Sequence, residues 1–179
     1  MKDLSSLKEL RQKQWIPVES IECNYQPHFR RVDGKYVEHD TIPHLCHIEL
    51  TYACNAKCIF CYNPERAKLG DLDVIDFIVN SVAQSQIPHV YLIGGEPSLV
   101  PVEKLNKYID ILSDHSSVTI VTNGIHQLKG ISRKLACFGV PIHGSNSETH
   151  EFLNQHSGSF QKTLTTIRHY VSEGHDVRC

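Results

Sequence analysis

The sequence lacks several features that mark specialised classes of protein. None of its apolar stretches approaches the ~20 residues that span a bilayer. Its 18 basic and 20 acidic side chains give a formal net charge of −2, which offers no electrostatic basis for binding nucleic acid or an anionic membrane. The opening residues, Met1 to Ser6, contain no apolar segment like that of a secretory signal peptide. We therefore expect a cytoplasmic protein with no nucleic-acid or membrane partner.

The composition otherwise fits an ordinary globular protein. Apolar residues make up 40% of the 179 residues, enough for one domain with a substantial core. Cysteine is abundant, with seven in the chain. An odd number, with three of them clustered, fits a metal or catalytic role in a reducing compartment better than a disulfide framework.

Strand-like and helix-like segments alternate from about residue 46 onward. Such alternation predicts right-handed crossovers and a parallel α/β sheet, either curled as a partial barrel or open and doubly wound. We expect about four to five strand–helix units. The expected strands are 47–51, 89–93, 117–121 and 140–142, with a fifth opening at 176–179. The expected helices are 73–84, one starting near Pro101, 128–138, and one starting at Ser159.

Three of these helices carry a clear apolar stripe. We expect Asp71 or Asp73 to cap the first of them, and Ser159 to cap the last. The expected buried faces are Val74, Ile78 and Val82 in the first helix, Val102, Leu105, Ile109 and Leu112 in the second, and Phe160, Leu164, Ile167 and Val171 in the last.

The first 45 residues are expected to form a separate extension, with a short helix over 4–14 and a hairpin over 28–38. The core domain is then 46–179. Its fifth strand has barely begun at Cys179, and a six-stranded partial barrel needs roughly 40 or more further residues. We therefore expect the core to be incomplete at its C-terminus. The alternative is a frayed tail on a complete four-stranded sheet.

The most informative feature is a group of three cysteines, Cys54, Cys58 and Cys61, that follows the first core strand. A four-iron cluster takes four thiolates and a structural zinc ion also takes four ligands. Three thiols therefore leave one metal position open for chemistry. The alternative is a zinc site whose fourth ligand is remote: His44, Cys46 or His47.

The spacing of these cysteines, with Phe60 before the last of them, resembles the cluster loop of the radical S-adenosylmethionine (SAM) enzymes. Two later segments resemble that family too, and each follows a strand. Gly94, Gly95, Glu96 and Pro97 resemble its GGEP segment, whose backbone groups receive the amino group of SAM. Thr122 and Asn123, before a glycine, resemble its TNG segment, whose polar side chains face the central cavity.

The region of the fourth strand departs from the family pattern. Pro141 replaces the usual serine and His143 the usual aspartate, while the glycine and the Glu-x-His that follow are kept. Contacts to the SAM ribose normally come from this strand end. His143, Ser145 and Asn146 are our candidates for them, and the alternative for His143 is a hydrogen-bonded turn histidine.

The resemblance implies a specific activity. A [4Fe–4S] cluster on Cys54, Cys58 and Cys61 would bind SAM and cleave it reductively to a 5′-deoxyadenosyl radical, which abstracts hydrogen from a substrate. Phe60 would lie against the adenine. A peptide substrate and a reductant such as flavodoxin or ferredoxin are expected, and no catalytic residue is assigned. The rival class is a metal- or cluster-binding interaction or electron-transfer module without SAM turnover.

Overall fold

The computed structural model describes residues 29–32, 35–38, 43–63, 65–85 and 87–179. The chain divides into two compact units, Met1–Thr41 and Ile42–Cys179. In the first unit, β1 (Phe29–Val32) pairs antiparallel with β2 (Lys35–Glu38), which confirms the strands of the expected hairpin. The turn of that hairpin and the helix expected over 4–14 lie outside the described residues.

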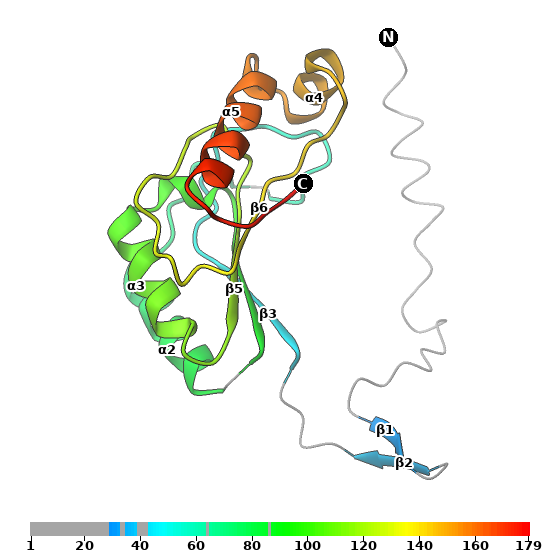
Figure 1. Ribbon diagram of the computed structural model, residues 1–179, viewed down its shortest axis with the longest axis vertical. Helices are drawn as coiled ribbons and strands as arrows, with labels where there is room; N and C mark the ends of the chain where they lie inside the picture. The colour runs from blue at the N-terminus through cyan, green and yellow to red at the C-terminus, as the bar shows by residue number, and fades with distance from the viewer. Residues whose placement is uncertain (1–28, 33–34, 39–42, 64, 86) are drawn as a thin grey trace. The chain divides into compact units, whose positions relative to one another are not determined.

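The second unit (Figure 1) is built on a parallel sheet. This sheet has five strands, which follow one another in chain order. This arrangement confirms the expected fold class, a partial parallel α/β barrel. The strands β4 and β5 have the expected bounds, whereas β3 begins two residues early and β6 lies three residues before the expected fourth strand. The strands are β3 (Leu45–Glu49), β4 (His89–Ile93), β5 (Ser117–Val121), β6 (Cys137–Gly139) and β7 (Val177–Arg178).

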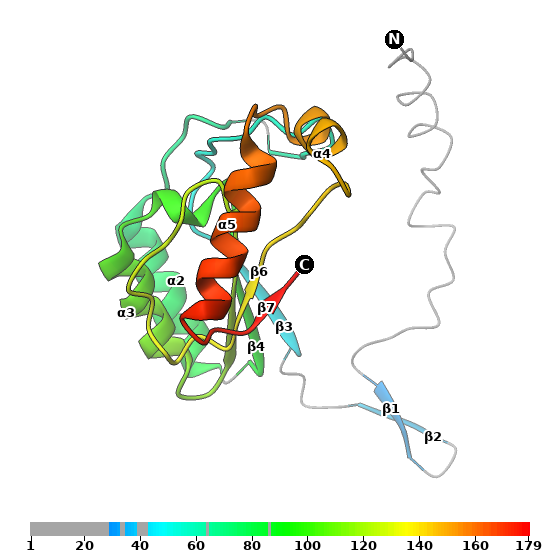
Figure 2. The ribbon, with the colours of Figure 1, turned by 45° about the horizontal axis from the view of Figure 1, so that its top comes forward.

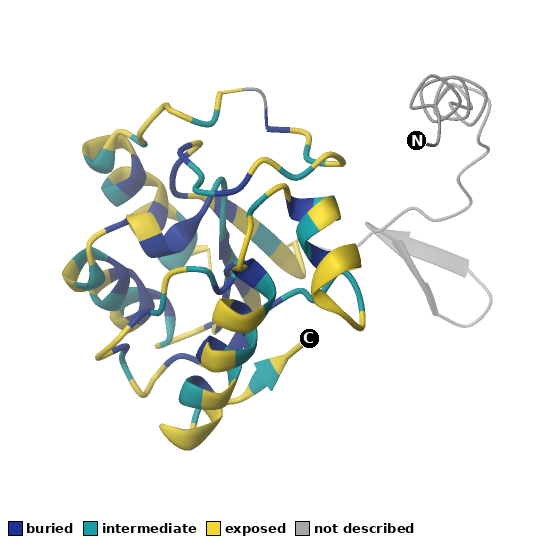
Figure 3. Ribbon diagram, turned by 90° about the horizontal axis from the view of Figure 1, so that it is seen from above, coloured by how far each residue is buried: buried dark blue, intermediate teal, exposed yellow. Residues whose placement is uncertain are grey.

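Three helices, α2 (Leu72–Gln84), α3 (Val102–Leu112) and α5 (Ser159–Ser172), cover one face of this sheet (Figure 2). A short turn of 3₁₀ helix, η2 (Pro97–Leu99), and the helix α4 (Ser147–Asn154) lie in connections that leave the carboxyl ends of the strands. The buried positions of the helices face the interior of this unit, and their exposed positions face outward (Figure 3). No helix in the described part of the chain has the length and apolar character needed to cross a membrane.

The core lies between the helices and one face of the sheet. It joins alternate strand residues to the inner sides of α2, α3 and α5, as expected from the two-residue period of a strand. In α3 the expected stripe is confirmed, since Leu105, Ile109 and Leu112 are fully buried. The strand contribution is Ile48, Val90, Leu92, Val118, Ile120 and Phe138.

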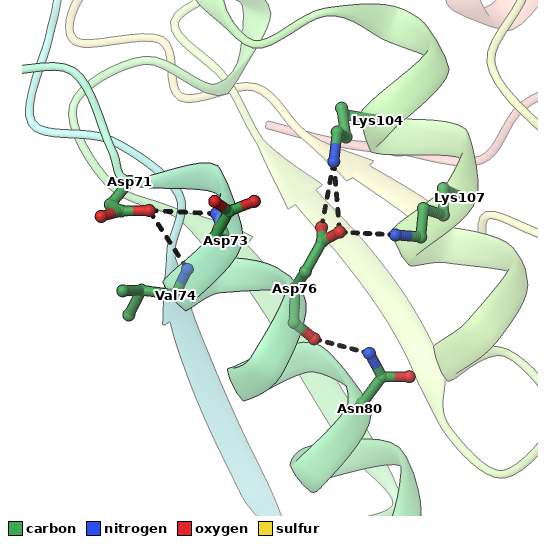
Figure 4. Close-up of polar contacts among 7 residues, drawn as sticks. All are labelled: Asp71, Asp73, Val74, Asp76, Asn80, Lys104 and Lys107. Carbon is green, nitrogen blue, oxygen red and sulfur yellow. Dashed lines mark hydrogen bonds and ion pairs between the residues drawn. The ribbon is translucent and has the colours of Figure 1, made fainter.

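The buried face of α2 is shifted by one position along the sequence from the expected face. Ile75 and Val79 are buried, whereas Val74 and Ile78 are 52% and 38% exposed. The rotation is explained by Asp76, which faces α3 and forms ion pairs with Lys104 and Lys107 at 3.2 and 2.6 Å (Figure 4). With Asp76 against α3, the position before it points to the sheet.

The start of α2 agrees with its sequence signal. The side chain of Asp71 accepts hydrogen bonds from the main-chain N–H groups of Asp73 and Val74 at 3.0 and 3.2 Å (Figure 4). Asp71 is therefore the N-cap, the first of the two expected alternatives.

The helix expected over 128–138 is wrong, because this segment is a loop that runs into β6. Its apolar residues Leu128, Ile131 and Leu135 are nevertheless buried. The loop backbone is held from outside: Asn106 of α3 donates to the Gly130 carbonyl and accepts from the Ser132 N–H. The Gly130 carbonyl and the Ser132 N–H therefore have hydrogen-bond partners without a helix, and the apolar side chains of this segment can be buried in a loop.

The last helix also begins and faces differently from the expectation. Gly158, not Ser159, is the N-cap, and the fully buried positions are Ser159, Thr163, Thr166 and Tyr170. Val171, expected inside, is 58% exposed. Tyr170 stacks on Phe138 with ring centres 3.8 Å apart, and its hydroxyl accepts the Leu128 N–H. This stacking sets the rotation of α5.

Candidate cofactor site at the carboxyl ends of the strands

The cysteine loop leaves the carboxyl end of β3 and runs beside the glycine segment that leaves β4. The N–H groups of Gly95 and Glu96 donate to the carbonyls of Thr51 and Ala53 at 2.6 and 2.9 Å. These bonds extend the β3–β4 pairing beyond both strands. The two segments that the sequence singled out therefore form one continuous piece of structure.

The glycines have a steric role toward the loop itself. A Cβ on Gly95 would lie 2.6 Å from the carbonyl carbon of Tyr52. Gly94 has φ +132°, and a Cβ there would also meet the main chain of Thr51. The sequence suggested that these glycines let a ligand approach the backbone. The structure shows that they let the cysteine loop approach it.

The three thiols of the loop are free and half-buried. Burial raises the pKa of Cys54 and of Cys58, and the positive charge of Arg66 opposes both shifts. The charges of the other two thiols, when ionised, also raise the pKa of Cys58. Three free thiols on one loop supply three of the four thiolates that a [4Fe–4S] cluster takes and leave one iron position open, so the chemistry of the donors fits such a group.

The structure gives no support to the zinc alternative. His44 lines a cavity of about 530 Å³ at the amino-terminal ends of the strands, opposite the cysteine loop. Cys46 packs against the core and His47 packs on Tyr91, with ring centres 5.3 Å apart. Within the described ranges, no three His, Cys, Asp or Glu side chains are grouped so as to hold a metal ion. A cluster spreads its thiolates over several iron atoms, which makes a wider site than one ion does.

Glu96 is a buried carboxylate that joins the ends of β4 and β5. It accepts hydrogen bonds from the Thr122 hydroxyl at 2.5 Å and from the Asn123 N–H at 2.8 Å, as well as from the N–H of Ser98 at 2.9 Å. Burial raises the pKa of this carboxyl, and these donors oppose the shift. Through these hydrogen bonds Glu96 connects the segment that follows β4 to the segment that follows β5.

Asn123 connects this assembly to the cysteine loop. Its side-chain amide donates to the side-chain oxygen of Asn55 at 2.7 Å. Its carbonyl accepts the hydroxyl of Thr163 from α5 at 2.9 Å. The residue next to Cys54 is therefore fixed by the loop after β5.

His143 lies beside the cysteine loop, half-buried. Its ring meets Phe60 edge-on with centres 4.8 Å apart and lies over His150 at 5.7 Å. Burial lowers its pKa. Ser145 is exposed, and Asn146 uses its side-chain oxygen to cap α4 through the Thr149 N–H. The structure thus brings Phe60 and His143 together but not the other two.

The helix α4 was missed in the sequence, and it has a direct role at the site. The carbonyls of Leu153 and Asn154, at its C-terminal end, accept the N–H groups of Ile59 and Lys57 at 3.0 Å each. The side chain of Asn154 is bonded in turn to Ser159 at the start of α5. The signal was present in the capping residue Asn146, but the helix has only eight residues and is largely polar.

Comparison with protein families agrees with this geometry. The model of the radical SAM superfamily matches residues 48–179, from β3 to the last residue. The chain belongs to the radical SAM superfamily. The matched span includes the cysteine loop, the glycine segment and α4.

Among curated radical SAM relatives, an AdoMet-dependent heme synthase of Methanosarcina barkeri is 32% identical over 135 residues, which is 70% of this chain and 38% of that protein. The antilisterial bacteriocin subtilosin biosynthesis protein AlbA of Bacillus subtilis is 27% identical over 141 residues, or 73% of this chain and 31% of that protein. The chain therefore spans about a third of the length of these relatives.

Among solved structures, Streptococcus suis SuiB bound to precursor peptide SuiA has a TM-score of 0.58 at 16% identity. The match covers 76% of this chain and 32% of SuiB. At this identity the likeness concerns the fold, which is that of the radical SAM core.

Proposed function

We propose that this chain holds a [4Fe–4S] cluster on Cys54, Cys58 and Cys61 and binds SAM beside it. The observation that carries the proposal is the fastening of a loop with three free thiols to the glycine segment. The chemistry that the cofactors supply when bound is the reductive cleavage of SAM to methionine and a 5′-deoxyadenosyl radical, which abstracts hydrogen from a substrate.

The residues around the loop support distinct roles in binding SAM. The N–H groups of Gly95 and Glu96 are committed to the cysteine loop. The carbonyls of Glu96 and Pro97 accept the N–H groups of Leu99 and Val100, so the carbonyls of Gly94 and Gly95 are our candidates to accept hydrogen bonds from an amine such as that of the methionine moiety. Phe60 is 44% exposed and its ring contacts that of His143, and we propose that an adenine packs on its exposed part.

We further propose that the substrate is a peptide. The support is the sequence similarity to a bacteriocin biosynthesis protein, at 27% identity. A cluster that must be reduced needs an electron donor, and a flavodoxin or ferredoxin would supply it. Free thiols that hold a cluster require a reducing compartment, so we place the protein in the cytoplasm.

The test is reconstitution of the chain with iron and sulfide in the absence of oxygen, followed by reduction and EPR spectroscopy with and without SAM. We expect a [4Fe–4S]⁺ signal that changes when SAM is added and that is lost in Cys58→Ala. The matched control is Cys46→Ala, because Cys46 lies on β3 and packs against the core. This variant should keep the signal.

Two results would contradict the proposal. Zinc in place of iron would leave a binding module with no radical chemistry. A cluster signal that SAM does not change would favour an electron-transfer module.

A further inference from the structure

Arg66 holds the cysteine loop at three points. One guanidinium nitrogen donates to the carbonyl of Ala56 at 2.9 Å, and another donates to the carbonyl of Cys58 at 3.0 Å. The main-chain carbonyl of Arg66 accepts the N–H of Cys54 at 3.0 Å. One residue outside the cysteine motif therefore fixes the backbone at the first two cysteines and between them.

The two side-chain bonds come from two different nitrogens of one guanidinium. Its planar fork holds its N–H donors in fixed directions, whereas the three donors of a lysine ammonium share one nitrogen at the end of a flexible stem. Hydrogen bonds from an ionised donor are also about twice as strong as neutral ones. These hydrogen bonds to the cysteine loop therefore depend on the shape of the Arg66 side chain as well as on its charge.

The charge of Arg66 acts on the sulfur atoms. Among the described residues it forms no ion pair with a carboxylate, in contrast to Lys68, which pairs with Glu65 at 3.3 Å. Its guanidinium donates to the carbonyl of Cys58 at 3.0 Å, so its positive charge lies against the backbone of the cysteine loop. A fixed positive charge beside thiolates favours the reduced, more negative state of whatever they bind.

We propose that Arg66 is a positioning residue that sets the cysteine loop in its cluster-receiving shape before any metal binds, and that its charge raises the reduction potential of the bound cluster. The second half rests on the proposed function. The first half concerns the metal-free chain alone. Partners of this kind, which orient metal ligands from outside, are worth 10–100-fold in metal affinity.

The experiment compares three variants of the full chain: Arg66→Met, Arg66→Lys and the control Lys68→Met. In the metal-free protein, amide hydrogen exchange is followed at Lys57 and Ile59, whose N–H groups are bonded to α4. We expect about tenfold faster exchange in Arg66→Met and Arg66→Lys, and no change in the control. After reconstitution, iron affinity should fall 10–100-fold in Arg66→Met.

The midpoint potential separates charge from shape. It should move to a more negative value in Arg66→Met and stay near the wild-type value in Arg66→Lys, which keeps the charge. If amide exchange is unchanged in both Arg66 variants, Arg66 does not position the cysteine loop. If the midpoint potential is unchanged in Arg66→Met, the charge of Arg66 does not raise the reduction potential. If the wild-type chain binds no cluster, the proposed function fails, but the exchange measurement still decides whether Arg66 fastens the loop.

Discussion

Replacing Gly95 by alanine tests the close approach of the glycine segment to the cysteine loop. The added methyl group would lie 2.6 Å from the carbonyl carbon of Tyr52. Carbon atoms in contact prefer about 3.5–4.0 Å, so the two segments must separate by about 1 Å. That movement lengthens the hydrogen bonds from Gly95 and Glu96, now 2.6 and 2.9 Å, beyond useful range.

The expected cost follows from these two effects. Each lost hydrogen bond costs about 1 kcal/mol, and the strain of overpacking costs about 1–3 kcal/mol. We therefore expect Gly95→Ala to lower the free energy of unfolding by about 3–5 kcal/mol. This is a large part of the 5–15 kcal/mol typical of a domain.

The assay is urea denaturation, together with the rate at which a thiol reagent modifies the cysteines in the native protein. The control is Gly130→Ala, a position with φ +70° but nothing within 4 Å of the added atom. It should cost about 1–2 kcal/mol for the left-handed conformation and leave the thiol reaction rate unchanged. A Gly95→Ala protein that unfolds within about 0.5 kcal/mol of wild type would refute the steric argument.

Two further predictions concern stability. Hydrogen bonds from Lys107 and Lys104 hold the pKa of Asp76 well below its usual range, so Asp76→Asn should lower the Tm at pH 7. The difference in Tm between this variant and the wild type should shrink as the pH falls below about 3.9, the pKa of an unfolded aspartate. A difference that stays constant down to pH 2 would argue against this. The control is Asp114→Asn, which removes a 3.7 Å surface ion pair. Asn154→Ala leaves the His156 N–H and the buried Ser159 hydroxyl without a partner and should cost about 1–3 kcal/mol in urea denaturation. The exposed Asn80→Ala should change stability by less than about 0.5 kcal/mol, and equal effects would contradict the assigned role.

The sequence predicted the features of the fold that depend on strong local patterns. The bounds of β4 and β5 and the buried stripe of α3 follow from apolar periodicity, because each of these elements packs in the direction that its pattern specifies. The faces of α2 and α5 could not be predicted in this way. They depend on single long-range contacts, Asp76 with α3 and Tyr170 on Phe138.

The loop over 128–136 and the helix α4 show in opposite ways that helical periodicity alone does not determine where helices form. Leu128, Ile131 and Leu135 have helical spacing but are buried in a loop, because Asn106 satisfies its backbone. In contrast, α4 is short and polar and is recognisable only once its contacts to the cysteine loop are known. At the candidate site, the sequence singled out two loops that the structure joins by hydrogen bonds, but Arg66 and Asn154, which bind to the cysteine loop, carry no motif.

The bonds between α4 and the cysteine loop bear on how the protein matures. The loop leaves the first strand of the sheet, yet its N–H groups at Lys57 and Ile59 find their acceptors in a helix near the end of the described chain. A nascent chain on the ribosome exposes the three thiols long before α4 has been synthesised. The loop cannot take up these two hydrogen bonds until α4 has been synthesised. On the proposed function, stable insertion of the cluster should therefore follow synthesis of α4, and the thiols exposed before then would need protection from oxidation.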